Sequence, residues 1–333
     1  MAPVAVLARA RCLARGSRSE NEGPLWHSWP PARPGAGPWS LKNPLFASTA
    51  LAARIEVAET DLIRAGAEAF ERASGERALL QPLAGGLAVH TRAGSPLNKV
   101  VGLGFAGPPA PAELAEVERA SAARGAPSVQ IELATLAEPG IAELLTRRGY
   151  ALVGFENVLG RALPAGVEAP RVPRDPSDPR DVQVERGTER DLEPWIATVT
   201  TGFATPDTQG VASHESFPRE LLETVLREMA SARGCVRYLA YRSGKLAGGA
   251  SMRLIGGVAQ LTGAATLPEH RRRGVQSALL AQRLTIAAEQ GCDVAVVTTQ
   301  PGSKSQENVQ KLGFHLLYTR AILVRELEAG SRR

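Results

Sequence analysis

The sequence contains an internal repeat, and this repeat limits the folds open to the chain more than any other feature. The segment Gly149–Arg161, GYALVGFENVLGR, aligns with Gly313–Arg325, GFHLLYTRAILVR, 164 residues later. Glycine, two leucines and arginine stand at the same places in both. Upstream, at the same offset, the alternating run Ile131–Thr135 falls on Ala295–Thr299. Two matches in one register indicate an internal duplication, in which each half is a copy of one α/β unit.

A proline-rich stretch divides the two copies. Residues 163–180, LPAGVEAPRVPRDPSDPR, contain five prolines. Each proline removes a backbone donor and fixes φ, so neither a helix nor the interior of a sheet is expected there. The sequence therefore predicts one domain at 52–162, a linker at 163–180 and a second domain at 181–327. Two domains also suit a length of 333 residues.

The N-terminal residues 1–45 have a composition unlike the rest. Met1 to Arg18 is rich in alanine and arginine and contains no acid, and residues 23–44 collect glycine, proline and tryptophan without periodicity. An arginine-rich, acid-poor start is typical of a transit peptide. A disordered leader, or a start codon placed too early, fits the same composition. We therefore expect residues 1–45 to lie outside the fold.

Charge and hydropathy exclude several classes of function. Six basic and two acidic residues lie in residues 1–50, which leaves 33 basic and 32 acidic groups in the rest of the chain. A nearly neutral body lacks the basic surface of a general nucleic-acid-binding protein. No run of 18 apolar residues is present, so a membrane span is not expected. The three cysteines are far apart, which fits a reducing cytoplasm, and the histidines do not have the spacing of metal ligands.

The second copy predicts a definite order of helices and strands. Alternating apolar runs, glycine pairs typical of hairpin turns, and a helix-capping pattern at Thr188 and Asp191 give the order β-α-α-β-β-β-α-β-α-β-β. The ranges with clear bounds are a helix at 218–232, strands at 235–241, 246–254 and 258–266, a helix at 275–290, a strand at 293–299 and a helix at 305–312. A pair of strands is expected at the C-terminal end.

The stretch Leu267–Leu280, LPEHRRRGVQSALL, joins the third of these strands to a helix. Backbone N–H groups at a helix N-terminus have no partner, and the helix dipole is positive there, so phosphate binds well. Gly274 lets the backbone approach a ligand closely, and Arg271–Arg273 supply charge and bidentate donors. The stretch therefore predicts a pyrophosphate-binding turn. It matches neither the GxxxxGK[ST] loop nor the dinucleotide-binding GxGxxG pattern.

At these residues the chain resembles the GNAT superfamily of N-acetyltransferases. That family marks its acetyl-CoA site with [QR]-x-x-G-x-[GA] between its fourth strand and third helix, and Arg271 and Gly274 fit the pattern. Gln310–Phe314, QKLGF, resembles a late motif of the family. The resemblance covers 181–327. Together with the duplication it implies an α/β fold of two tandem GNAT-like units, each a mixed, mostly antiparallel sheet flanked by helices.

The resemblance also implies a set of residues that bind acetyl-CoA. The strand would pair with the pantetheine arm, the turn and the first residues of the helix would hold the pyrophosphate, and a later helix would line the cofactor. These residues are Ala264, Ala265, Thr266, Arg271, Arg272, Arg273, Gly274, Val275, Gln276, Ser277, Ser305 and Asn308. Gln276 departs from the family's Gly or Ala, so its side chain must point away from the phosphate.

The catalytic groups of the family are only partly matched. Val309 stands where relatives often have a tyrosine that protonates the departing thiolate. Tyr318 and Asn308 are the candidate catalytic residues, with Tyr318 as the acid; a strand tyrosine with a structural hydroxyl group is the alternative. The strand before the turn contains no acid that could serve as a base. His214 and Glu215 lie on a loop where acceptors usually bind in the family.

The first copy lacks the phosphate turn. At the 164-residue offset Gly107–Ala112, GPPAPA, stands in its place, without arginine and with three prolines that have no N–H to donate. We therefore expect a degenerate copy that does not bind CoA. It would pack against the active copy or help to form the acceptor cleft.

The leading hypothesis is an acyltransferase, namely an acetyl-CoA-dependent N-acetyltransferase without a metal. It would transfer the acetyl group directly to a small-molecule or peptide amine in a ternary complex. The alternative is a non-catalytic acyl-CoA-binding or regulatory module, which the missing acid and base favour. The sequence does not identify the acceptor, and it leaves a homodimer open.

Overall fold

The computed structural model describes residues 45–163, 182–205, 211 and 217–327. We call residues 45–163 the first half and residues 182–327 the second half. The predicted leader and linker lie outside the described residues, apart from one residue of each.

Helices and strands follow one another along each half. In the first half they are α1 (Thr49–Ser74), β1 (Leu79–Leu83), β2 (Gly86–His90), β3 (Lys99–Val101), α2 (Pro111–Ala123), β4 (Ser128–Ala134), α3 (Ile141–Arg147) and β5 (Ala151–Ala162). In the second half they are β6 (Val182–Arg186), α4 (Leu192–Ala204), α5 (Arg219–Ala230), β7 (Cys235–Arg242), β8 (Lys245–Ile255), β9 (Val258–Thr266), α6 (Val275–Glu289), β10 (Val294–Thr299), α7 (Lys304–Lys311) and β11 (His315–Glu326). The elements expected between residues 218 and 312 are all present.

The two halves repeat each other at the offset found in the sequence. Adding 164 to the bounds of β5 gives the bounds of β11, and adding it to the first residue of α2 gives the first residue of α6. Helices α3 and α7 end at residues related by the same offset. The two tandem units that the duplication predicted are therefore confirmed.

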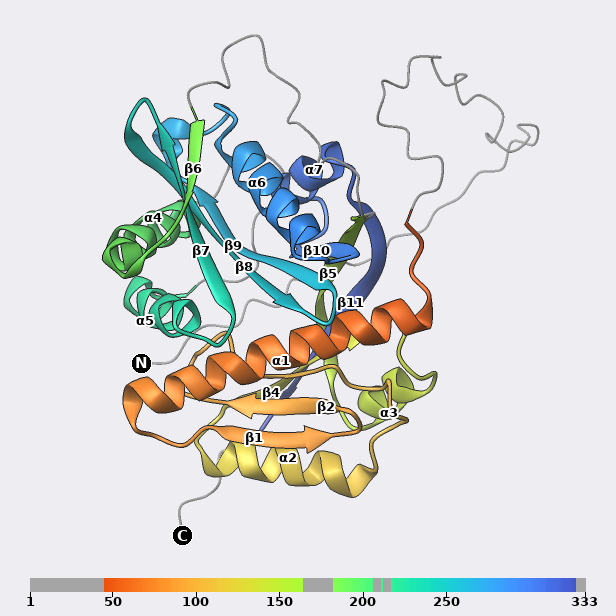
Figure 1. Ribbon diagram of the computed structural model, residues 1–333. Coiled ribbons are helices and arrows are strands. Elements are labelled where there is room, and N and C mark those ends of the chain that lie inside the picture. The colour runs from red at the N-terminus through yellow and green to blue at the C-terminus, as the bar shows by residue number, and fades with distance from the viewer. Residues whose placement is uncertain (1–44, 164–181, 206–210, 212–216, 328–333) are drawn as a thin grey trace, which may run out of the picture. The chain divides into compact units, whose positions relative to one another are not determined.

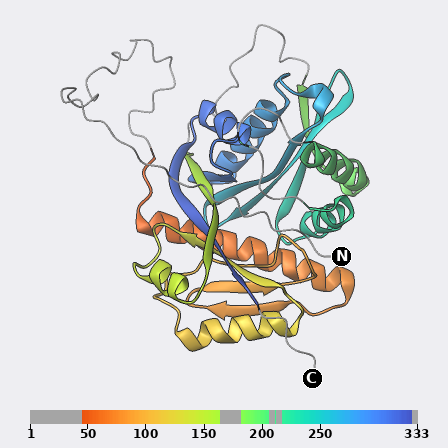
Figure 2. The ribbon, with the colours of Figure 1, turned by 180° about the vertical axis from the view of Figure 1, so that it is seen from behind.

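One sheet runs through both halves, and the last strands of the halves are exchanged. Among the described residues the strand order is β1-β2-β3-β4-β11-β5-β10-β9-β8-β7-β6. β11 pairs antiparallel with β4 of the first half, and β5 pairs antiparallel with β10 of the second. Figure 2 shows β11 (blue) running from the second half into the first. Each half therefore completes the sheet of the other.

The expected pair of strands at the C-terminal end is wrong. His315–Glu326 forms the single strand β11, whose pairing with β5 shifts register between Leu316 and Tyr318 and again between Ile322 and Leu323. The run contains neither glycine nor proline to turn the chain. The neighbour that a hairpin would have supplied is β5 from the first half.

Helices cover both faces of the sheet. Along β7, Leu239 packs with α4 and α5, whereas the alternate residues Tyr238 and Ala240 pack with α6. Helices α2 and α3 pack with β4 in the first half. No helix in the described ranges has both the length and the apolar composition needed to cross a bilayer.

The long helix α1 serves both halves. Ser48 caps its first turn by accepting a hydrogen bond from a backbone N–H, and Gly75 ends it with φ of 75°. Ile55 packs in one cluster with Val258 of β9, whereas Ile63, two turns later, packs with β2. Figure 1 shows α1 (orange) lying between the strands of the two halves. Residues of α1 therefore reach the second half from the first.

Candidate active site

Two parallel strands of the second half separate at their carboxyl ends. β9 and β10 pair at only three positions, the last of which joins Gln260 to Val296. β9 then continues to Thr266 and β10 to Thr299 without pairing to each other. The last five residues of β9 are partly exposed, although its first four are buried. The gap therefore leaves the edge of β9 open to an extended ligand, because backbone groups there need hydrogen-bond partners.

A bulge bends β9 beside this gap. Gly249 of β8 pairs with Ala265 of β9, and Ser251 pairs with Thr262. Between these two pairs β9 has two residues and β8 has one. Gly263 takes φ of 57° at this place, a conformation that favours glycine. Bulges re-aim backbone groups and are frequent next to active sites. The family resemblance assigned Ala264, Ala265 and Thr266 to the pantetheine arm. Ala264 lies in the bulge, Ala265 and Thr266 follow it, and all three are partly exposed.

The turn between β9 and α6 presents unpaired backbone N–H groups. Arg272 and Gly274 take φ of 58° and 78° as the chain enters the helix. Within the described part of the chain, no N–H group of Arg272–Ser277 has a hydrogen-bond partner. A Cβ added to Gly274 would have no atom within 4 Å. The turn is therefore open, and its N–H groups add to the positive end of the helix dipole.

The three arginines of the turn have different surroundings. Arg271 donates hydrogen bonds to the backbone oxygens of Thr205 and Gly202 at the end of α4. We expected a phosphate-binding donor at this position, but the Arg271 guanidinium is engaged in holding α4 against the turn. Arg272 and Arg273 are exposed, and neither has a hydrogen bond or ion pair with another described residue. These two side chains are the ones available to an anion.

The equivalent helix of the first half is closed to anions. α2 begins at Pro111, which has no N–H, and the Ala110 N–H donates a 2.7 Å hydrogen bond to the Glu113 carboxylate. By the 164-residue offset, Glu113 stands where the second half has Ser277. The N-terminus of α2 therefore already carries a carboxylate of its own chain, which repels a second anion.

Gln276 and Asn308 join α6 to α7. The side-chain oxygen of Gln276 accepts a 2.6 Å hydrogen bond from Asn308 Nδ2. This contact engages Asn308, one of the two candidate catalytic residues. Ser305, on the same helix, is exposed. Val275 is buried in the core of the second half, so only its backbone is free to serve a ligand.

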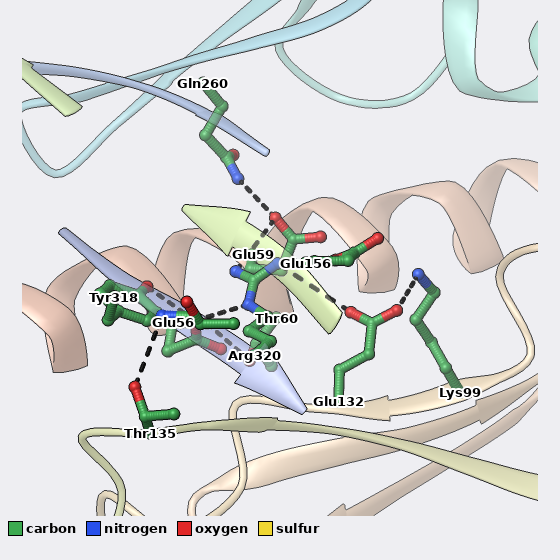
Figure 3. A network of polar contacts seen from close by, with 11 residues as sticks. Glu56, Glu59, Thr60, Lys99, Glu132, Thr135, Glu156, Gln260, Tyr318 and Arg320 are labelled. Carbon is green, nitrogen blue, oxygen red and sulfur yellow. Dashed lines mark hydrogen bonds and ion pairs between the residues drawn. The ribbon is translucent and has the colours of Figure 1, made fainter. Parts of the chain in front are cut away.

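Tyr318, the candidate acid, lies in a buried network of charged side chains (Figure 3). Its hydroxyl group donates a 2.7 Å hydrogen bond to Glu56, and the residue is 4% exposed. Burial, and next the Glu56 carboxylate, raises the pKa of Tyr318. The hydroxyl proton is thus committed to Glu56.

Four glutamates of this network were not among the predicted site residues. They are Glu56 and Glu59 on α1, Glu132 on β4 and Glu156 on β5. Gln260 of β9 reaches the network by donating a 3.4 Å hydrogen bond to Glu59. The sequence did contain a signal for two of them. Glu56 and Glu59 are three residues apart and lie next to the buried Ile55 and Ala58, on the apolar face of a helix. His214 and Glu215, expected near the acceptor, lie outside the described residues.

Comparison with known families agrees with this geometry. The model of the acetyltransferase (GNAT) family matches residues 203–314. These residues form a GNAT domain. The GNAT domain contains the separated strands, the open turn and helices α6 and α7. No curated protein matches the sequence.

Two solved structures share the fold of the GNAT domain and its partner half. The GCN5-related N-acetyltransferase from Kribbella flavida superposes with a TM-score of 0.57 at 19% identity, over 82% of this chain and 95% of its own. A tandem GNAT protein from the clavulanic acid biosynthesis pathway has a TM-score of 0.50 at 15% identity, over 83% of this chain and 97% of its own. At these identities the likeness shows the fold alone, here two units with a GNAT-like fold in one chain.

Proposed function

We propose that the chain is an acetyl-CoA-dependent N-acetyltransferase that acts on an amine. The observation that carries this proposal is the row of unpaired N–H groups at Arg272–Ser277, beside the gap between β9 and β10. A helix N-terminus with free N–H groups binds phosphate. An open strand edge suits an extended arm such as pantetheine. Both features lie within the segment that matches the GNAT family.

The residues present fit acetyl-CoA. The backbone of Arg272–Ser277 would hold the pyrophosphate, with Arg272 and Arg273 as charged donors, and Ala264–Thr266 would pair with the pantetheine arm. The open space at Gly274 leaves room for phosphate oxygens to approach the backbone. Acetyl-CoA, when bound, supplies an activated acyl group. Backbone N–H groups at the end of β9 would polarise the acyl carbonyl.

The first half would have another part in the reaction. Glu113 and the prolines before α2 leave no phosphate site there, so we propose a single CoA site, in the second half. The first half contributes β5 to the sheet beside β10, and α1 to the face of that sheet. It therefore lies where it can form one wall of the acceptor cleft.

Calorimetry and a thiol assay test the proposal together. CoA should bind the full-length chain, and acetyl-CoA should release free thiol when a suitable amine from a panel is added. CoA binding without thiol release for any amine would favour the non-catalytic acyl-CoA-binding module. Absence of CoA binding would contradict both functions.

A further inference from the structure

Gln260 stands at the last position where β9 and β10 pair, and its side chain faces α1. The neighbours Ala259 and Leu261 pack with α6, so the alternate residue projects to the other face, as Val258 does. Gln260 is 3% exposed, and its Nε2 donates to Glu59 while its Oε1 has no hydrogen-bond partner. A buried amide oxygen without a donor is unfavourable, so a donating ligand fits this place.

Two carboxylates of the network are tightly held. Glu56 accepts a 2.8 Å hydrogen bond from Arg320 Nε, and Glu132 accepts a 2.5 Å hydrogen bond from Lys99. Each of the two glutamates is 2% exposed. Arg320 and Lys99, the two cations drawn in the network, therefore make their hydrogen bonds to Glu56 and Glu132 (Figure 3).

The other two carboxylates are held loosely. Arg320 lies 3.8 Å from Glu59 and 3.7 Å from Glu156, distances that are too long for hydrogen bonds. The side chains of Glu59 and Glu156 are 15% and 22% exposed, so they form the solvent side of the network. They are therefore the carboxylates that a ligand can reach.

The network has more carboxylates than cations. When all four glutamates are ionised, Lys99 and Arg320 balance only half of their charge. Burial raises the pKa of Glu59, and burial with the neighbouring Glu132 raises the pKa of Glu156 to about 7. A positive ligand would replace the protons that these groups otherwise retain. Among the described residues, no group of three or more His, Cys, Asp or Glu side chains is placed to hold a metal ion. An organic cation is therefore the better fit.

One loosely held carboxylate lies at the point where β9 and β10 separate, and the other lies near the end of β10. Glu59 contacts Gln260 at the last pair of β9 and β10. On the other side, Glu156 lies on β5, one residue before the partner of Thr299 at the end of β10. Thr298 is exposed. It lies on the same face of β10 as Val294 and Val296, which pack in one cluster with Ile55 of α1. An acceptor entering from this face would meet both carboxylates next to the gap.

We propose that the acceptor is an aliphatic amine that arrives as an ammonium ion, binds on the solvent side of Glu59 and Glu156, and gives its proton to Glu59. This inference rests on the proposed function. Helix α1 and strand β5 supply the two carboxylates, so the first half takes part directly in the reaction, while the second half holds the acetyl donor.

The proton transfers complete a balanced reaction. The ammonium ion loses one proton to the Glu59 carboxylate, and the nitrogen lone pair then forms a bond to the acetyl carbon. The carbon–sulfur bond breaks, and its electron pair leaves with the thiolate. The acylated nitrogen loses its second proton, which the thiolate gains through solvent, and Glu59 returns its proton to water before the next turnover.

Two probes of equal length test the charge of the acceptor site. 1,4-Diaminobutane and 4-aminobutyrate each offer a primary amine, and their far ends are an ammonium and a carboxylate. With acetyl-CoA and the full-length chain, we expect kcat/KM for the diamine to be at least about tenfold higher, because the carboxylates attract a cation and repel an anion. With CoA present, the diamine should also raise the melting temperature, and 4-aminobutyrate should not.

Two substitutions test the assigned residues. Glu59→Gln should lower kcat for the diamine by about 10²-fold or more, the range of general-base catalysis, with the Kd of CoA unchanged. Glu156→Gln should raise KM for the diamine and reduce the preference over 4-aminobutyrate. Glu68→Gln makes the same charge change on α1 at a residue without a hydrogen bond or ion pair to another described residue, and should behave as the wild type.

The outcomes separate this inference from the proposed function. Three results would overturn the acceptor site if the chain binds CoA. They are equal kcat/KM for the two probes, no response to the diamine in either the kinetic or the melting measurement, and less than a tenfold loss of kcat in Glu59→Gln. If Glu59→Gln does not fold, Glu59→Asp takes its place, and an unchanged kcat overturns the role of Glu59. Failure of the wild type to bind CoA contradicts the proposed function itself.

Discussion

The hydroxyl group of Tyr318 donates a 2.7 Å hydrogen bond to Glu56, which joins strand β11 to helix α1. Arg320, two residues along the same strand, donates a 2.8 Å hydrogen bond to the same carboxylate. All three side chains are buried. The last strand therefore brings two donors into the first half, and Tyr318 serves this junction.

Tyr318→Phe should affect stability more than catalysis. The change keeps the ring and removes one of the two donors to the buried Glu56, so the free energy of unfolding should fall by about 1–3 kcal/mol. Because the hydroxyl proton is bound to Glu56, the maximal rate of thiol release should fall less than tenfold. Urea unfolding and the thiol assay measure the two effects. A hundredfold loss of rate with the fold and the Kd of CoA intact would make Tyr318 the catalytic acid.

The elements of the second half could be predicted because their signals are local. Ser243 and Gly244 take φ of 50° and 71°, as the turn of a two-residue hairpin requires, and the sequence places them between two alternating apolar runs. The open turn before α6 was predictable for the same reason, since Pro268 and Gly274 mark the end of a strand and the start of a helix. Local chemistry was sufficient for both.

The strand exchange and the charge network could not be predicted, because they depend on contacts distant in sequence. Nothing within β5 or β11 specifies that each strand pairs with the other half. The partner of Tyr318 lies 262 residues away, and the contact between Glu59 and Gln260 spans 201 residues. The sequence therefore predicted the open turn before α6, but it left the acceptor side of the proposed site without a candidate base among the described residues.

Ser277→Glu should close the open turn before α6, as Glu113 closes the start of α2. The new carboxylate would lie at the position equivalent to Glu113, among N–H groups that are now unpaired. It would satisfy those groups and repel phosphate, so the Kd of CoA should rise by about 10²-fold or more. Calorimetry gives the Kd, and Ser277→Gln, of similar size and without charge, is the matched control. An unchanged Kd in Ser277→Glu would show that phosphate binds elsewhere.

One CoA molecule should bind each chain. The first half offers prolines and a bound carboxylate at the start of α2, whereas the second half offers the open turn of Arg272–Ser277. Calorimetric titration of the wild type should give a stoichiometry of one, and Ser277→Glu should abolish this single event. A stoichiometry of two would contradict the assignment of a silent first half.

Glu156 should make stability depend on pH. Burial and then Glu132 raise its pKa to about 7 from 4.5, against the attraction of Lys99 and Arg320, and Glu59 also raises it. The folded chain holds a proton that the unfolded chain releases, so this contribution to stability is complete below about pH 4.5 and is lost as pH rises through about 7. The loss is at most about 1.4 kcal/mol per pH unit in this window.

Glu156→Gln provides the test of this pH dependence. Glutamine stays neutral, so the variant should gain about 1–3 kcal/mol in the free energy of unfolding relative to the wild type between pH 5 and pH 8. Urea unfolding at both pH values measures the difference. The opposite result is that the two chains differ in their free energy of unfolding by the same amount at pH 5 and at pH 8. That result would mean that Glu156 is ionised in the folded chain at both pH values.

Arg283→Met should weaken CoA binding from a distance. Arg283 lies on α6, is 1% exposed, and donates to the backbone oxygens of Ser251 at 2.8 Å and of Thr262 at 3.4 Å, on the two strands beside the bulge. Burial lowers its pKa to about 10. Methionine keeps the apolar stem but donates nothing, so the bulge loses the side chain that fixes its carbonyl groups.

We expect the Kd of CoA to rise by about tenfold or more in Arg283→Met, and hydrogen exchange at the end of β9 to quicken. The net change in stability should stay within about 3 kcal/mol, because removing a buried charge offsets part of the lost hydrogen bonding. Arg119→Met, at an arginine that is 70% exposed on α2, is the control for loss of charge. If Arg283→Met leaves both the Kd and the exchange of Thr262 and Ala264 unchanged, the bulge keeps its shape without Arg283, and the backbone of β9 alone sets the geometry that we assign to the pantetheine arm.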